Sequence, residues 1–165
     1  MRDEQYMQLA LYLAQVAYRR GEIPVGAVVV RDEEIIGWAC NEKEARQDAS
    51  AHAELLAMQR ATAFQGSWRL TGATLYSTLE PCPMCAGVMI NSRLSRLVYG
   101  ARDSKAGAAG SVLELLRCPG LNHQVEVTEG ILGEESADLL SSFFLDLRRD
   151  GRVGRRRSTR NRVGG

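Results

Sequence analysis

The chain has 165 residues, of which 45% are hydrophobic and 25% are charged, and its formal net charge is +1. This composition fits one ordinary globular domain, and it excludes a membrane-spanning protein because no segment approaches the ~18 consecutive apolar residues of a span. The first six residues contain no apolar stretch typical of a secretory signal, so we expect the cytoplasm and no membrane association.

The charge is unevenly distributed along the chain. Residues 148–165 contain eight arginines and one acid, Asp150, for a net charge of +7, which leaves −6 for residues 1–147. We therefore expect one domain over residues 1–147 and a flexible, arginine-rich tail over residues 148–165. The tail suggests a polyanionic partner such as nucleic acid; alternatively it is a solvated segment that keeps the protein soluble.

The hydrophobic pattern predicts an alternation of helices and strands. In the first half it predicts a helix over residues 4–20, strands over 25–30 and 34–40 joined by a turn, a polar connection over 42–50, and a helix over 52–63 capped by Asp48 or Ser50. In the second half it predicts strands over 73–79, 94–99 and 124–128, helices over 83–91 and 134–147, a Gly/Ala-rich loop over 100–110, and a helical turn over 112–116. This order indicates an α/β architecture with a sheet covered on both faces.

Two short motifs carry the residues suited to metal chemistry: His52-Ala53-Glu54 and Pro81-Cys82-Pro83-Met84-Cys85. One imidazole and two thiolates form a three-ligand zinc site that leaves the fourth position for water or substrate. The two cysteines share one side of a first helical turn, whose positive end favours thiolates. His52 and Glu54 would point to nearly opposite sides of a regular helix, so they converge only if the metal lies off the helix end, near its axis.

The role of Glu54 follows from the proposed metal. A zinc-bound water has a pKa near neutrality and is the predicted nucleophile, and a carboxylate that is not a ligand can pass its proton to a ring nitrogen and then to a leaving amine. The motifs therefore predict hydrolytic deamination of an amidine-like carbon. The alternative is a closed structural site with a fourth ligand from Cys40, Cys118 or His123, which would leave Glu54 without a role.

Further segments extend the pattern beyond the zinc motif. They are residues 23–28 (IPVGAV), 51–54 (AHAE), 74–87 (TLYSTLEPCPMCAG), 100–111 (GARDSKAGAAGS), 122–127 (NHQVEV) and 130–132 (GIL). The zinc motif is typical of the whole cytidine deaminase-like superfamily, whereas the segments at 100–111 and 122–127 narrow the likeness to one branch. On these residues the chain resembles the bacterial tRNA-specific adenosine deaminases.

The resemblance implies a fold, a reaction and an assembly. The implied fold is a three-layer αβα sandwich around a five-stranded mixed sheet, and the implied assembly is a homodimer with one Zn²⁺ per subunit. The implied reaction converts adenosine to inosine at the wobble position of a tRNA anticodon, typically in an arginine tRNA. His52, Cys82 and Cys85 would hold the zinc, and Glu54 would shuttle protons.

The resemblance also implies three substrate contacts. Asn41 matches an asparagine that hydrogen-bonds the flipped base, Ile23 lies in the segment that walls the base pocket, and Asp103 lies in the loop that lines the anticodon-binding surface. Asn41 could instead be a turn residue that ends a strand, and Asp103 a carboxylate that makes a local turn. Besides the tail, we expect the positive charge for RNA phosphates at four residues: Arg93, Arg96, Arg102 and Lys105.

Two other functions compete with this interpretation. A deaminase of free bases or nucleosides would use the same zinc chemistry, but the loop around Asp103 and the arginine tail argue against it. A non-catalytic zinc module, such as an RNA-binding partner subunit, would not need Glu54, which is present here.

Overall fold

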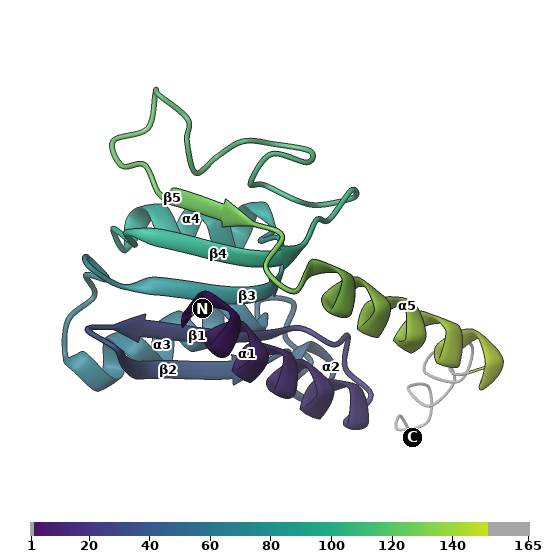
Figure 1. Ribbon diagram of the computed structural model, residues 1–165. Helices are drawn as coiled ribbons and strands as arrows, with labels where there is room; N and C mark the ends of the chain where they lie inside the picture. The colour runs from purple at the N-terminus through teal and green to yellow at the C-terminus, as the bar shows by residue number, and fades with distance from the viewer. Residues whose placement is uncertain (1, 152–165) are drawn as a thin grey trace, which may run out of the picture.

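A five-stranded mixed sheet in the order β2-β1-β3-β4-β5 forms the centre of the computed structural model, which describes residues 2–151 (Figure 1). The strands are β1 (Gly26–Arg31), β2 (Glu34–Cys40), β3 (Thr74–Leu79), β4 (Arg96–Ala101) and β5 (Glu126–Glu129). Strand β1 is antiparallel to both β2 and β3, whereas β3, β4 and β5 run parallel. The carboxyl ends of β3 and β4 therefore lie at one edge of the sheet.

Helices cover both faces of the sheet, as Figure 1 shows. One layer contains α1 (Arg2–Arg19) and α5 (Gly133–Arg149), and the other contains α3 (Ala53–Gln65) and α4 (Pro83–Asn91). A short helix, α2 (Lys43–Arg46), follows β2. The expected three-layer αβα sandwich is confirmed.

Strand β1 shows how the sequence forms two cores. Four of its residues are buried apolar side chains, and successive side chains of a strand point to opposite faces. Ala27 and Val29 belong to the core under α3 and α4, while Val28 and Val30 belong to the smaller core under α1. A continuous apolar run is therefore what a strand buried on both faces requires.

Two segments differ from the sequence-based expectation. The predicted helical turn over residues 112–116 is wrong: the backbone there turns back on itself, and the carbonyl of Gly107 accepts hydrogen bonds from the N–H groups of Val112 and Leu113. The predicted polar connection over residues 42–50 contains the short helix α2, which the sequence pattern did not predict.

The predicted boundary between domain and tail falls inside the last helix. Helix α5 continues through Arg149, two residues beyond the predicted end of the domain, and residues 152–165 of the predicted tail lie outside the described residues. Among residues 2–151, no helix combines the length and apolar character that crossing a bilayer requires.

Candidate active site

Both metal-binding motifs stand where a helix begins. His52 is the N-cap residue of α3 and Cys82 is the N-cap residue of α4, each with extended backbone angles and neither with a side-chain capping bond. Cys85 follows in the first turn of α4. The predicted cap of α3 is therefore wrong: Asp48 instead accepts hydrogen bonds from the backbone N–H and the hydroxyl of Ser50. The metal-binding side chains thus gather off the ends of two helices, as the spacing of the motifs predicts.

The three predicted ligands are spaced for a tetrahedral metal. Nδ1 of His52 lies 3.5 Å from Sγ of Cys82 and 3.7 Å from Sγ of Cys85, and the ligand atoms all lie within 4.8 Å of one another. Typical Zn–N and Zn–S bond lengths place the N and S ligands of a tetrahedral zinc about 3.6 Å apart. The donor set and its spacing therefore fit zinc.

A closed four-ligand site does not form in the described part of the chain. The metal-binding cluster there contains His52, Cys82 and Cys85, without Cys40, Cys118 or His123. His123 donates from Nε2 to the carbonyl of Leu94 at 2.8 Å instead. Because residues 152–165 include no His, Cys, Asp or Glu, the cluster would offer a metal ion three protein ligands of these types and leave a fourth position open.

Burial and neighbouring sulfurs shift the ionisation of the groups at this site. Glu54, in the first turn of α3, is only 4% exposed, and this burial raises the pKa of its carboxyl group to about 7. A hydrogen bond from the Cys85 thiol lowers the pKa of Cys82 to about 4. Glu54 is thus a carboxyl group in a poorly hydrated site that can exchange protons near neutral pH.

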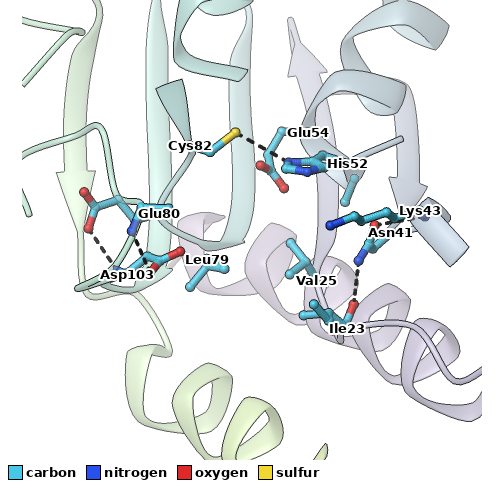
Figure 2. Close-up of a pocket in the computed structure, with 12 residues that line it drawn as sticks. Ile23, Val25, Asn41, Lys43, His52, Glu54, Leu79, Glu80, Cys82 and Asp103 are labelled. Atoms are coloured by element: carbon cyan, nitrogen blue, oxygen red, sulfur yellow. Dashed lines mark hydrogen bonds between the residues drawn. The ribbon is translucent and has the colours of Figure 1, made fainter. Parts of the chain in front are cut away.

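A cavity of about 200 Å³ opens beside the metal-binding cluster (Figure 2). Its wall is formed by Ile23, Val25, Asn41, Lys43, His52, Ala53, Glu54, Leu79, Glu80, Cys82, Asp103 and Ala106. Six of the seven predicted site residues line it directly. The seventh, Cys85, belongs to the metal-binding cluster but is fully buried. The structure therefore brings together residues from five separate segments of the chain.

Asn41 is held in place by its own backbone neighbours. Its side-chain N–H donates to the carbonyl of Ile23 at 3.2 Å, and its side-chain oxygen accepts from the N–H of Lys43 at 3.3 Å. A primary amide has a second N–H and a second lone pair. The two contacts orient Asn41, and they leave its second N–H and its second oxygen lone pair unused.

Asp103 makes the local turn that is one of its two predicted roles, and it also lies at the cavity. Its carboxylate accepts hydrogen bonds from the N–H groups of Lys105 and Ala106 at 3.0 and 3.2 Å, which makes a local turn. The same residue lines the cavity, opposite Asn41 in Figure 2. The turn therefore fixes the loop that forms this side of the cavity.

The expected positive surface is wrong for two of its arginines. Arg96 starts β4, at the opposite end of the strand from Ala101 and the cavity, and forms an ion pair with Asp3. Arg102 forms an ion pair with Glu129. Lys105 remains next to the cavity, on the loop that contains Asp103.

Lys43 also lies at the cavity, although it belongs to none of the sequence motifs. Figure 2 shows its side chain extending from the Asn41 side toward His52. In the described part of the chain no carboxylate lies within ion-pair distance of its ammonium group. The only local signal is its place two residues after Asn41, which is too weak to identify it in advance.

Comparisons with known proteins agree with the geometry. The family described as MafB19-like deaminase matches residues 1–148. The chain is 47% identical over 154 residues to the tRNA-specific adenosine deaminase of Bacillus subtilis, covering 93% of this chain and 96% of the relative. It is 45% identical over 152 residues to the Haemophilus influenzae protein of the same name, covering 92% and 88%.

Two solved structures are similar over most of the fold. One, from a study of A-to-I editing by tRNA:A34 deaminases at the wobble position of transfer RNA, has a TM-score of 0.79 at 41% identity and covers 82% of this chain and 98% of that chain. The other, a guanine deaminase from Nitrosomonas europaea, has a TM-score of 0.73 at 25% identity and covers 85% and 83%.

Proposed function

Because the chain belongs to the family of tRNA-specific adenosine deaminases, we propose that it converts adenosine to inosine at the wobble position of a tRNA anticodon. The observation that carries the proposal is an open three-ligand metal site with Glu54 beside it, at the bottom of a cavity large enough for a base. An arginine tRNA is the expected substrate, and the cytoplasm the expected compartment.

His52, Cys82 and Cys85 would hold one zinc ion per subunit. When bound, zinc would supply a water molecule acidic enough to act as a nucleophile near neutral pH. Glu54 would accept a proton from the attacking water at its carboxylate and donate it to a ring nitrogen of the base. It would then accept the second proton, from the hydroxyl group added to the ring carbon, and donate it to the departing amine. Its burial excludes bulk water from this exchange.

The cavity suits a base that has left its stack. Enzymes that react at a base edge act on flipped or single-stranded nucleotides, and an anticodon loop offers such bases. Ile23, Val25 and Leu79 supply apolar walls for the ring, and Asn41 supplies the oriented donor and acceptor.

Lys43 and Lys105 are candidates to contact the phosphates next to the target base. Lys43 lines the cavity, and Lys105 lies in the chain between Asp103 and Ala106, which line it. No ion pair among the described residues involves either lysine. Residues 1–147 carry a net charge of −6, so unpaired cations beside the cavity matter for the approach of RNA.

A homodimer is the assembly we propose. The layer formed by α3 and α4 has a groove of about 230 Å³ lined in part by Met58, Trp68 and Val88, and Phe64 and Trp68 are more than half exposed. Exposed apolar surface of this kind is typical of an interface. Light scattering coupled to size exclusion would give twice the subunit mass if the proposal is right.

A second candidate function is deamination of a free base, because the similar fold of the guanine deaminase accommodates a free purine. The two functions are separated by incubating the zinc-loaded protein with an arginine anticodon stem-loop carrying wobble adenosine and, in parallel, with free adenosine, guanine and cytosine. Inosine in the stem-loop with no turnover of the free compounds supports our proposal. Turnover of a free base alone would replace it with the second function.

A further inference from the structure

Two buried carboxylates beside the cavity take no part in the proposed proton transfer. Glu22 and Glu80 are each 1% exposed, although a buried carboxylate is costly unless hydrogen bonds satisfy it. We propose that they are positioning residues: each holds one wall of the cavity by binding backbone N–H groups. The proposal deepens the proposed function, on which it rests.

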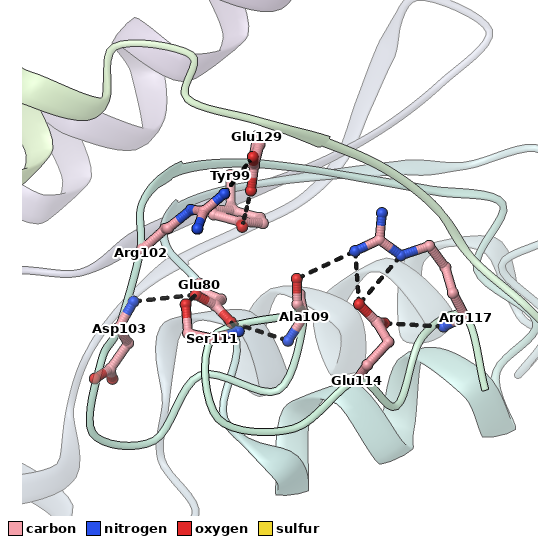
Figure 3. A network of polar contacts seen from close by, with 9 residues as sticks. All are labelled: Glu80, Tyr99, Arg102, Asp103, Ala109, Ser111, Glu114, Arg117 and Glu129. Atoms are coloured by element: carbon pink, nitrogen blue, oxygen red, sulfur yellow. Dashed lines mark hydrogen bonds and ion pairs between the residues drawn. The ribbon is translucent and has the colours of Figure 1, made fainter.

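Glu80 binds the loop that carries Asp103 (Figure 3). One of its carboxylate oxygens accepts from the N–H of Asp103 at 3.1 Å and from the hydroxyl of Ser111. The other oxygen accepts from the N–H groups of Ala109 and Ser111 at 3.0 and 3.1 Å. A single side chain therefore ties three backbone positions of residues 103–111 together.

The loop is closely packed around this carboxylate. A Cβ added to Gly107 would lie 2.3 Å from a carboxylate oxygen of Glu80, so only glycine leaves room there. Glu80 also stands two residues before the metal ligand Cys82. The loop wall of the cavity is thereby fixed relative to the segment that holds the metal.

Glu22 holds the opposite wall in the same way. Its carboxylate accepts from the N–H of Glu44 at 2.7 Å and from the N–H of Ala45 at 3.3 Å, both at the start of α2. Helix α2 begins with Lys43, directly after the segment that contains Asn41. With only four residues, α2 has little stability of its own, so a contact from a distant residue decides where it lies.

The chemistry of these sites calls for a carboxylate in particular. All the contacts of Glu22 and Glu80 come from donors, and a carboxylate offers two acceptor oxygens. Glutamine has the same shape but only one acceptor oxygen, so its NH₂ group would face an N–H donor. In Glu80→Gln the amide oxygen can still accept hydrogen bonds from the N–H groups of Ala109 and Ser111. The N–H of Asp103 then has no acceptor on this side chain.

The first test is amide hydrogen exchange, measured by NMR on the zinc-loaded protein. We expect Glu80→Gln to speed exchange at Asp103, and Glu22→Gln to speed it at Ala45, each about tenfold or more. Glu80→Gln should leave the exchange rate at Ala45 unchanged, and Glu22→Gln should leave the rate at Asp103 unchanged. Glu114→Gln is the matched control, because this carboxylate lies in the same loop region but binds Arg117, outside the cavity.

The second test is kinetic and uses the anticodon stem-loop. A misplaced wall weakens both binding and orientation of the base, so we expect KM to rise about tenfold and kcat/KM to fall about 10- to 100-fold, with one zinc retained per chain. A smaller folded fraction would lower kcat alone and leave KM unchanged. If the glutamine variants do not fold, Ser111→Ala and Glu22→Asp should show smaller changes in the same direction.

Three results would overturn the proposal: unchanged amide exchange in the variants, a KM equal to that of the wild type, or loss of zinc. The first would show that the walls are held by other contacts, and the last that the glutamates serve the metal site. If the wild type itself made no inosine, the proposed function would fail, while amide exchange would still decide whether the glutamates anchor the walls.

Discussion

His52 and Cys82 occupy equivalent positions, since each is the last extended residue before a helix. The free N–H groups and the positive end of a helix lie just there, and they stabilise the thiolates that bind a metal. The same position explains how His52 and Glu54 serve one site although they are two residues apart. The metal-binding atoms meet beyond the helix ends, near the helix axes. There, side chains that would point to opposite sides of a helix can still reach the same metal ion.

The first prediction concerns the number of metal ligands. Cys85→Ser should lose zinc, because an alcohol binds zinc much more weakly than a thiolate and Cys85 is one of three protein ligands. Cys118→Ser and His123→Gln should each retain one zinc per chain. Elemental analysis after dialysis measures the zinc content per chain. Zinc loss in either control would support a closed structural site in which Cys118 or His123 is the fourth ligand.

At the scale of elements, the sequence predicts what local patterns determine. The structure contains the features that local sequence patterns predict. These are the helices and strands with their hydrophobic periods, the helix starts at both metal motifs, and the β-hairpin. Helix α2 was not predicted because the glutamate that caps it lies far away in sequence. Residues 112–116 have a helical apolar pattern, but hydrogen bonds to Gly107 and Ala108 hold a turned backbone.

The residues of the candidate site also fall into two groups: those that local motifs predict and those that only the fold brings to the site. The metal ligands and Glu54 are recognisable because short motifs contain them. Lys43 and Glu80 lie at the cavity because the fold brings distant segments together, and the spacing of the metal motifs does not predict a place there for either residue. The expected basic surface was wrong at Arg96 and Arg102, because these two arginines form ion pairs with Asp3 and Glu129, which are distant in sequence.

The second prediction concerns the packing of α3 on β2. A Cβ at Gly37 would lie 2.3 Å from the carbonyl oxygen of Ala57 and 2.7 Å from the nitrogen of Ala61. Gly37→Ala should therefore force strand and helix apart and lower the free energy of unfolding by about 1–3 kcal/mol.

Urea unfolding of the zinc-loaded protein measures this effect. Gly120→Ala is the control, because a Cβ there meets no atom within 4 Å, and it should change stability by less than about 0.5 kcal/mol. Equal stability of Gly37→Ala and the wild type would show that the helix can move away at no cost.

At the scale of the whole molecule, the sheet topology places the site. The parallel strands β3 and β4 end beside each other, and the segments that follow them supply Cys82 and Asp103. Ligands bind at the carboxyl ends of strands in such sheets because loops diverge there. On the far face, α1 is tied to β4 by the bidentate contact of Arg96 with Asp3, with both distances at 2.9 Å.

The third prediction is a pH dependence of this link. The hydrogen bonds from Arg96 lower the pKa of Asp3, so the ion pair stabilises the fold above the unfolded-state pKa of about 3.9 and is lost as the pH falls through the lower folded-state value. Asp3→Asn should lower the free energy of unfolding by about 1–2 kcal/mol at neutral pH, and its difference from the wild type should shrink toward about pH 3.

Thermal unfolding of the wild type and the variant, compared at each pH, removes the effect of zinc loss common to both. Asp138→Asn, an exposed change on α5, should match the wild type throughout. A difference between Asp3→Asn and the wild type that stays constant with pH would show that the carboxylate charge is not what holds α1.

The fourth prediction tests the central claim most directly: inosine formation in an arginine anticodon stem-loop with wobble adenosine, by the zinc-loaded wild type and by Glu54→Ala. We expect inosine from the wild type, and a rate about 100- to 10,000-fold lower from Glu54→Ala, with zinc content and fold retained. Equal rates would show that Glu54 does not move the proton. No inosine from a folded, zinc-loaded wild type would contradict the proposed reaction itself.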